Sequence, residues 1–303
     1  MDPRETVRRE GQKPRAGALN LAPRDGKLCC GPLEPQGDEL LSDDPKSGAG
    51  AVHEPLLGKT ALVTGATRGI GRAIARKLAT HGANVVVTYM NSHEEAEALS
   101  EEIRGMGRRA HVVQTNVADP ASIEEAFEDL RGEFDTVDIV ISNAALGVLK
   151  PAMELTRKHW RWCMETNALA LNELARQAVP MMPPRGGRIL ALSSLGASRA
   201  IPHYAYIGAS KAALEALVRS LAQELGPKGI RVNAVSAGVV DTDALKHFPQ
   251  RDTLLSEYAA RTPAGPTLSP EQVADAVYLL CLDEADMITG HTLVVDGGYC
   301  ISG

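Results

Sequence analysis

The architecture of the chain follows from the stretch TALVTGATRGIG, which covers residues 60–71. Its first five residues are apolar or β-branched and predict a strand from Thr60 to Thr64. Three glycines, Gly65, Gly69 and Gly71, then lead into an apolar helix. Glycines at such a turn let the backbone approach a pyrophosphate, and the amides at the helix N-terminus face the anion. The stretch therefore predicts a strand, a phosphate-binding turn and a helix.

From Lys59 onward, short β-branched runs alternate with segments of helical periodicity, which is typical of a doubly wound parallel sheet. We expect one Rossmann-like α/β domain over residues 58–303. Its seven parallel strands should lie near residues 60–64, 84–89, 111–115, 137–142, 188–192, 230–236 and 291–295. Residues 242–268 form an unusually long connection, and we interpret them as a substrate lid.

Composition narrows the class of protein further. The chain has 303 residues, is 44% hydrophobic and carries a net charge of −6, which argues against nucleic-acid binding. No apolar run is long enough to span a membrane, and the five cysteines lack metal-ligand spacing. We expect a cytoplasmic protein with reduced thiols and no metal. Residues 1–57 are polar, rich in Gly and Pro and without apolar periodicity, so we interpret them as a disordered tail.

The residues after the second predicted strand bear on the cofactor. This strand, Asn84 to Tyr89, is followed by Met90, Asn91 and Ser92, without an Asp or Glu. A carboxylate there would hold the 2′-hydroxyl of NAD and repel the 2′-phosphate of NADP. Its absence, together with a basic Arg68 in the glycine turn, favours NADPH.

The stretch SSLGASRAIPHYAYIGASK, residues 193–211, contains the candidate chemistry. Around a helix, Tyr204 lies about 20° from Lys211, whereas Tyr206 points about 140° away. Tyr204 is therefore the candidate acid, and we expect the Lys211 ammonium to lower the pKa of its phenol. The position four before Lys211 is Ile207, which has no proton to donate. An acid seven residues before the lysine suits reduction of an enoyl thioester, since the charge then develops on an oxygen several bonds from the carbon that accepts hydride.

Taken together, the glycine turn, Asn143-Ala-Ala145, Asn167, Ser194 and Lys211 resemble the short-chain dehydrogenase/reductase family over about residues 58–300. That family usually has a Tyr four before the Lys. The displaced Tyr204 and the runs ASRAIPHYAYIGASKAALEAL and DTDALKHFPQRDTLL are instead similar to enoyl-acyl-carrier-protein reductases, in particular type III, the NADPH-dependent bacterial isoform.

The resemblance implies roles for individual residues. Tyr204 would stabilise or protonate the enolate, Lys211 would hold the nicotinamide ribose, Asn167 would order the helix and a water chain, and Ser194 would have a lesser role. The remaining cofactor contacts implied by the resemblance are the phosphate-lining Gly65, Thr67, Arg68, Gly69, Ile70 and Gly71, the adenine-binding Asn116 and Val117, Asn143 on the adenosine side, and Val240 and Thr242 beside the nicotinamide amide and diphosphate.

The function implied by the resemblance is NADPH-dependent reduction of trans-2-enoyl-acyl-carrier protein in fatty-acid synthesis, by a homotetramer with weak sensitivity to triclosan. Acyl-carrier protein is acidic, so Arg199, Lys246 and Arg251 near the lid are candidate docking residues. Two alternatives stay open: a 3-ketoacyl or hydroxysteroid carbonyl reductase that uses Tyr204, and a non-catalytic NADP-binding regulator.

Overall fold

The computed structural model describes residues 54–243, 245, 251–265 and 268–302. Within them the chain forms a seven-stranded sheet of order β3-β2-β1-β4-β5-β6-β7, in which every neighbouring pair is parallel. This confirms the predicted Rossmann-like α/β fold. The strands are β1 (Thr60–Val63), β2 (Asn84–Tyr89), β3 (Ala110–Gln114), β4 (Ile139–Ser142), β5 (Arg188–Ser194), β6 (Arg231–Ala237) and β7 (Thr292–Val295).

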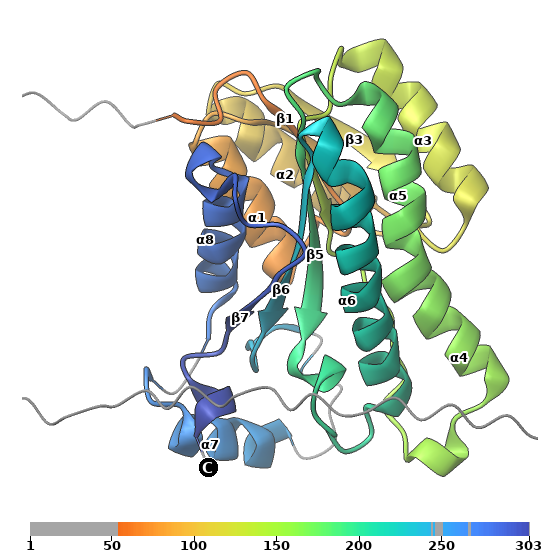
Figure 1. The fold of residues 1–303 in the computed structure, drawn as a ribbon, viewed down its shortest axis with the longest axis vertical. Helices are drawn as coiled ribbons and strands as arrows, with labels where there is room; N and C mark the ends of the chain where they lie inside the picture. Colours follow the sequence, from red (N-terminus) through yellow and green to blue (C-terminus); the bar gives the residue numbers. More distant parts are fainter. Residues whose placement is uncertain (1–53, 244, 246–250, 266–267, 303) are drawn as a thin grey trace, which may run out of the picture. The chain divides into compact units, whose positions relative to one another are not determined.

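Helices cover both faces of the sheet (Figure 1). One hydrophobic cluster joins the sheet to α1, α2 and α8, and a second joins it to α3, α5 and α6. Parallel strands covered on both faces need apolar residues on both sides, which explains the continuous apolar runs of β1 and β4. The helices are α1 (Gly69–Thr80), α2 (His93–Gly105), α3 (Pro120–Glu133), α4 (Arg157–Met164), α5 (Ala170–Ala178), α6 (Ala205–Leu225), α7 (Arg251–Arg261) and α8 (Pro270–Cys281).

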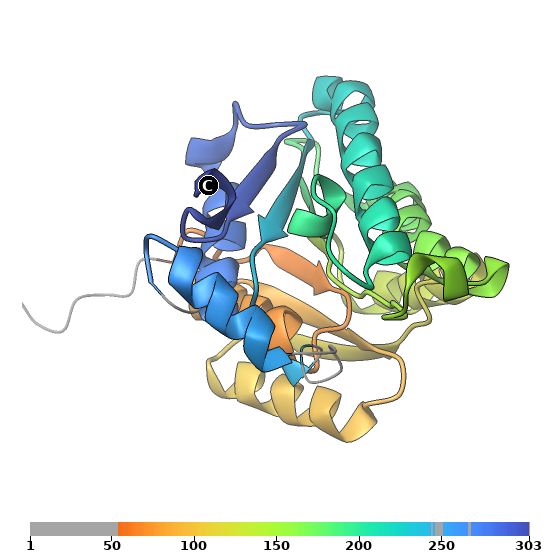
Figure 2. The same cartoon turned by 90° about the horizontal axis from the view of Figure 1, so that it is seen from below.

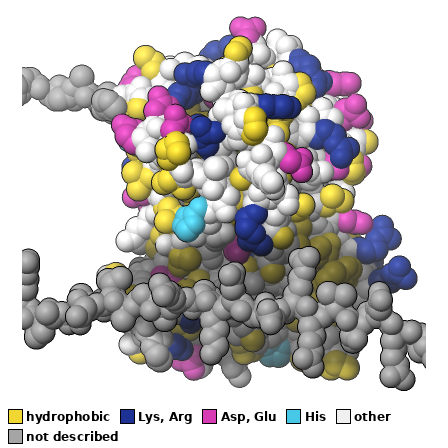
Figure 3. Space-filling view, viewed as in Figure 1, with side chains coloured by type: hydrophobic (Ala, Val, Ile, Leu, Met, Phe, Trp, Pro, Cys, Tyr) yellow, Lys and Arg dark blue, Asp and Glu magenta, His cyan; other side chains and the backbone are white. Residues whose placement is uncertain are grey.

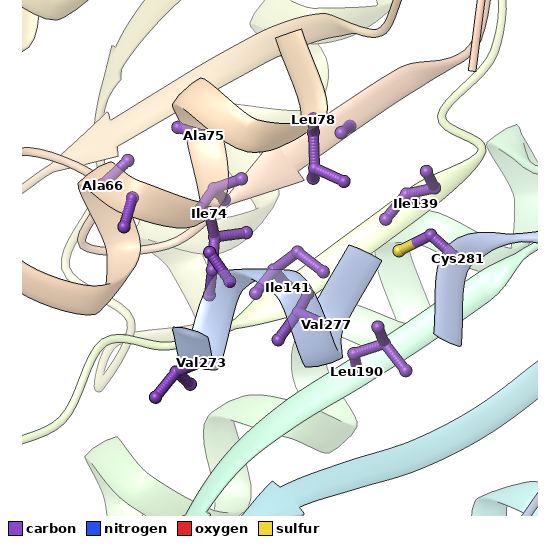
Figure 4. Close-up of a cluster of buried hydrophobic side chains, with 14 of the residues drawn as sticks. Ala66, Ile74, Ala75, Leu78, Ile139, Ile141, Leu190, Val273, Val277 and Cys281 are labelled. Carbon is purple, nitrogen blue, oxygen red and sulfur yellow. The ribbon is translucent and has the colours of Figure 1, made fainter. Parts of the chain in front are cut away.

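Helices α1 and α8 pack side by side on the first face (Figure 4). Ile74 and Leu78 of α1 are fully buried there, and Val273 and Val277 of α8 face them over Ile141 of β4. Burying each such aliphatic side chain stabilises the fold by about 1.5–3 kcal/mol. This packing holds the start of α1, and with it the glycine turn, against the sheet.

The strand order reverses between β1 and β4, and the carboxyl ends of all the strands meet at one edge of the sheet. In open α/β sheets this edge is where ligands bind. Helix α7 lies beyond this edge, across the ends of β6 and β7 (Figures 1 and 2). The predicted lid is therefore at the expected place, although residues 244, 246–250 and 266–267 lie outside the described part of the chain.

One predicted boundary differs from the structure. The domain includes residues before the predicted start at 58, because Leu56 is fully buried and Glu54 pairs with Arg108. The rest of the predicted tail, residues 1–53 with Cys29 and Cys30, lies outside the described residues. Helix α4 begins at Arg157, where Thr156 and His159 form a capping box.

Candidate active site

Tyr204 stands immediately before α6 rather than within it. His203 has a φ of 63°, a left-handed conformation that turns the chain just ahead of the tyrosine. The Tyr204 ring packs on Gly196 in the turn after β5, where an added Cβ would lie 2.6 Å from two ring carbons. The phenol hydrogen-bonds with the Ser194 hydroxyl. The structure therefore brings Tyr204 and Ser194 together at the carboxyl end of the sheet.

The prediction about the Tyr204 phenol was wrong in two respects. The angle of about 20° from Lys211 assumed a continuous helix through both residues, whereas α6 begins only at Ala205. Moreover, burial raises the pKa of Tyr204, and the hydrogen bond with Ser194 offsets only part of this rise. Loss of solvation outweighs any help from a cation. The phenol therefore stays protonated at neutral pH and is able to donate.

Lys211 is buried in α6, and its Nζ donates a hydrogen bond to the Leu192 carbonyl of β5 at 2.7 Å. Desolvation lowers the pKa of Lys211 to about 8, and the nearby Cys163 thiol opposes this shift. The ammonium is thus close to its titration point at physiological pH. A lysine in this state changes charge readily when a partner binds beside it.

Asn167 lies at the centre of a π-helical segment, Glu165–Leu169, that separates α4 from α5. Its Nδ2 donates to the Leu146 carbonyl and to Ser210 Oγ, both at 2.9 Å, and its Oδ1 accepts from the Leu146 amide at 2.8 Å. Single π turns are frequent at functional sites. Here the turn directs a buried amide at the chain that follows β4 and at the residue before Lys211.

Ile207 occupies the position four before Lys211. It is buried, and an added Cβ on Gly147 would lie 2.2 Å from Ile207 Cδ1. The isoleucine therefore packs directly on the backbone of the segment after β4. Position 207 therefore carries an aliphatic side chain where a tyrosine would supply a phenol.

The glycine turn is held by hydrogen bonds from the end of β4. Thr64 Oγ1 accepts from the backbone amides of Asn143 and Ala144 at 2.9 and 3.0 Å. Asn143 Nδ2 donates to the Thr64 and Gly65 carbonyls at 2.8 and 3.1 Å. A Cβ on Gly71 would lie 2.3 Å from the Gly65 oxygen, so this position needs glycine. Asn143 therefore shapes the turn, in addition to its predicted place beside the adenosine.

The residues of the turn fit a dinucleotide phosphate. Gly65 and Gly69 have φ values of 61° and 52°, in the left-handed region that glycine adopts readily. Helix α1 has no side-chain cap on its first amides and no acidic residue in its first turn. No side chain at the start of the helix therefore competes with a phosphate for these amide donors. Thr242 lies beside the turn, since a Cβ on Gly69 would be 3.5 Å from Thr242 Cγ2. Its predicted contact with the diphosphate stays a prediction.

The other predicted cofactor residues lie along the same edge. Arg68 is exposed, Thr67 is buried and Ile70 is half-buried at the start of α1. Asn116 follows β3, and its Oδ1 accepts from the Ala118 amide at 3.2 Å, a local turn that leaves Val117 buried. Val240 bridges to Leu268 after β6. Among the described residues, no acidic side chain directly follows β2, where Met90 and Asn91 are exposed.

Three contributors to the site were missed in the sequence analysis. They are Thr64 as the acceptor for two amides, Ser210 as the link between Asn167 and the Ile207 carbonyl, and Cys163, which is buried close enough to Lys211 and Tyr204 to influence both pKa values. Polar residues within apolar runs were the available signal for Thr64 and Ser210. Nothing in the sequence places Cys163 beside residues about forty positions away in the chain.

Helix α7, within the segment predicted to be a lid, is anchored to the end of β7. Tyr258 is buried and donates to the Asp296 carbonyl at 2.9 Å. Of the three predicted docking residues, Arg251 pairs with Asp241 at 2.8 Å and Arg199 Nη2 donates to the Cys300 carbonyl. Lys246 lies outside the described residues. The two described arginines therefore already have partners within the chain.

Comparison with known proteins identifies the family. A family model described as "Enoyl-(Acyl carrier protein) reductase" matches residues 65–300, which include the glycine turn, Asn143, Asn167, Tyr204 and Lys211. The chain belongs to the short-chain dehydrogenase/reductase family.

Relatives within the short-chain dehydrogenase/reductase family differ in their reactions. The chain is 38% identical over 249 residues to 1-cyclohexenylcarbonyl-CoA reductase of Streptomyces collinus, covering 80% of this chain and 87% of that protein. It is 39% identical over 242 residues to the 3-oxoacyl-[acyl-carrier-protein] reductase FabG of Escherichia coli K12, covering 80% and 97%. The crystal structure of Bacillus cereus enoyl-acyl carrier protein reductase with NADP+ and indole naphthyridinone superposes with a TM-score of 0.78 at 33% identity, covering 82% and 99%.

Within the described residues, no helix combines the length and the apolar character needed to cross a lipid bilayer. The described cysteines Cys163, Cys281 and Cys300 are free thiols.

Proposed function

We propose that this short-chain dehydrogenase/reductase reduces the carbon–carbon double bond of trans-2-enoyl thioesters on acyl-carrier protein, with NADPH as the reductant. One observation carries the proposal: Tyr204, seven residues before Lys211, packs on the Gly196 turn and hydrogen-bonds with Ser194, while Ile207 fills the position four before the lysine. A phenol placed there suits an oxygen remote from the carbon that receives hydride.

The family model and two of the proteins compared support this assignment in different ways. The family model carries the enoyl reductase description, and the Bacillus cereus structure is an enoyl reductase with bound NADP+. The name of the Streptomyces collinus relative denotes a thioester with a double bond next to its carbonyl. The absence of a carboxylate after β2 and the exposed Arg68 favour the 2′-phosphate of NADPH.

Each residue of the site would have a separate role in this reaction. The glycine turn would hold NADPH, which would supply hydride to the β-carbon. Tyr204, protonated because it is buried, donates a hydrogen bond to the thioester oxygen as negative charge develops there and then provides the proton. Ser194 orients the phenol, and Lys211, held by its hydrogen bond to the Leu192 carbonyl, would present its ammonium to the ribose hydroxyls.

The decisive test is Tyr204→Phe. Crotonyl-thioester turnover should fall by at least about 100-fold, as expected for loss of a general acid, while the Kd for NADPH changes by less than twofold. Tyr206→Phe is the matched control, because Tyr206 lies against Trp160 instead of the Ser194 turn, with ring centroids 5.2 Å apart. A fully active Tyr204→Phe enzyme would show that the phenol is not the acid.

A second candidate is reduction of 3-oxoacyl thioesters, which the 39% identity to FabG favours. Assays with crotonyl and acetoacetyl thioesters of the same carrier, each with NADPH and with NADH, separate the two reactions. Binding of NADPH without turnover of either substrate would instead support a regulatory protein. Homotetramer formation and weak triclosan inhibition remain predictions, which light scattering and an inhibitor titration of crotonyl reduction check.

A further inference from the structure

Helix α4 opens with a basic and aromatic surface. Its first six residues are Arg157, Lys158, His159, Trp160, Arg161 and Trp162, and all except His159 are exposed. Lys150, in the segment that leads to the helix, is exposed as well. We call Lys150, Arg157, Lys158 and Arg161, together with Trp160 and Trp162, the α4 patch.

The helical geometry points the cations of the α4 patch toward solvent. At about 100° per residue, Arg157, Lys158 and Arg161 fall within an arc of about 100°. Cys163, which is buried, lies roughly opposite the centre of this arc. Trp160 and Trp162 flank the three cations on either side, with 41% and 39% of their surface exposed. The arrangement is a positive stripe between two partly exposed indoles.

The α4 patch borders the active site. The Lys150 amide donates to the His203 carbonyl at 3.2 Å, one residue before Tyr204. Trp160 meets Tyr206 edge to face, with ring centroids 5.2 Å apart. Helix α4 also begins at the edge of the sheet where the strands end (Figure 1), and Lys and Arg side chains project beside its position in the space-filling view (Figure 3). A partner on this surface would therefore lie next to the segment that carries Tyr204.

The charges of the patch are largely available to a partner. Lys150 and Arg157 form no ion pair with any residue that the structure describes. Lys158 lies over the Trp162 ring at 4.6 Å, and Arg161 approaches Glu165 at 3.3 Å. Glu154 and Glu165 are the acidic residues between positions 150 and 165. This concentration of positive charge is notable on a chain whose net charge is −6.

We propose that the α4 patch is the docking surface for an acidic carrier protein that delivers the acyl thioester. The inference rests on the proposed function, and it specifies the partner and its position. Interfaces are enriched in Trp and Arg, and opposite charges at their rims accelerate association. Arg199 and Arg251, two of the docking residues first suggested by the sequence, are engaged with Cys300 and Asp241, whereas Lys150 and Arg157 have no such partners among the residues that the structure describes.

The test combines Arg157→Glu, Lys158→Glu and Arg161→Glu in one variant of the full chain. The matched control reverses Arg131, Arg219 and Lys228, which are exposed near the opposite edge of the sheet, so both triple variants have the same net charge. Steady-state kinetics are measured with crotonyl-acyl-carrier protein and with crotonyl-N-acetylcysteamine, an uncharged thioester without a carrier. Binding of holo-acyl-carrier protein without an acyl group is measured by surface plasmon resonance at low and high salt.

The α4 variant should raise the KM for the carrier thioester and weaken binding of the holo-carrier by about tenfold or more at low salt. The difference should shrink at high salt, since screening weakens contacts between exposed charges. Turnover of the N-acetylcysteamine thioester and the melting temperature should match those of the control variant. Equal carrier binding by the α4 and control variants would overturn the proposal.

Two other occupants of the α4 patch would give different results, and either result would also overturn the proposal of carrier docking. A shift in oligomeric state by light scattering, seen only for the α4 variant, would identify the patch as a contact between copies of this chain. Binding of wild-type protein to phosphatidylglycerol vesicles but not to holo-carrier would identify a membrane surface. Failure of the proposed function is distinguishable, because wild-type protein would then bind the holo-carrier through the patch without reducing any crotonyl thioester.

Discussion

Replacement of Lys211 by methionine should alter how the stability of the protein depends on pH. Burial lowers the pKa of Lys211 from 10.5 to about 8. Between these two values the unfolded chain binds a proton that the folded chain does not, so this group makes the free energy of unfolding rise with pH through the window. Below pH 8 the folded protein bears the full cost of a buried ammonium. Lys211→Met removes that cost.

The size of the effect follows from the two pKa values. The cost is about 3 kcal/mol at pH 7 and about 2 kcal/mol at pH 9, at about 1.4 kcal/mol per pKa unit. The substitution also leaves the Leu192 carbonyl without its donor, at a cost of about 1–3 kcal/mol that does not depend on pH. The two contributions oppose each other at any one pH. The free energy of unfolding of Lys211→Met minus that of wild type should nevertheless decrease by about 1 kcal/mol from pH 7 to pH 9.

Urea denaturation of wild type and Lys211→Met at equal protein concentration, at pH 7 and pH 9, measures this change. Other groups whose pKa is raised by burial, such as Cys281 and Tyr204, occur in both proteins and largely cancel in the comparison. Lys158→Met, at an exposed position of α4, is the control and should show no such change. A difference between wild type and Lys211→Met that stays constant from pH 7 to pH 9 would refute the reasoning about burial.

Three further predictions concern neighbouring parts of the site. Gly71→Ala should lower the free energy of unfolding by about 1–3 kcal/mol and weaken NADPH binding, because the new Cβ meets the Gly65 oxygen at 2.3 Å; calorimetry and fluorescence titration check this, and unchanged NADPH affinity would contradict it. Asn167→Ala removes the partner of the Leu146 amide and carbonyl and one of the two hydrogen bonds of the Ser210 hydroxyl, so it should destabilise by about 1–3 kcal/mol in urea; a loss below about 1 kcal/mol would mean that water replaces these bonds. Ile207→Tyr restores a phenol four before Lys211 and should raise the ratio of acetoacetyl to crotonyl thioester turnover, whereas an unchanged ratio would show that this position does not select between the two reactions.

Much of the fold was predictable because its signals are local. The apolar strand at residues 60–64, the glycines after it and the alternation of strands with helices depend on neighbours within a few positions in the chain. The parallel sheet and the left-handed glycines of the turn followed from these patterns and are confirmed, whereas the role of residues 242–268 as a lid stays a prediction. The capping box at Thr156, which depends on side-chain hydrogen bonds, and the π segment at Asn167 were not predicted.

The sequence by itself determined the residue types of the site and their spacing: a tyrosine seven before the lysine, an isoleucine between them and no carboxylate after the second strand. Only the tertiary structure decided their ionisation and their partners. Burial, which depends on contacts between residues far apart in the chain, raises the pKa of Tyr204 and lowers that of Lys211. The same long-range packing brings Trp160 of α4 beside Tyr206 and Lys150 beside His203, so that the charged start of α4 lies next to the segment that carries Tyr204.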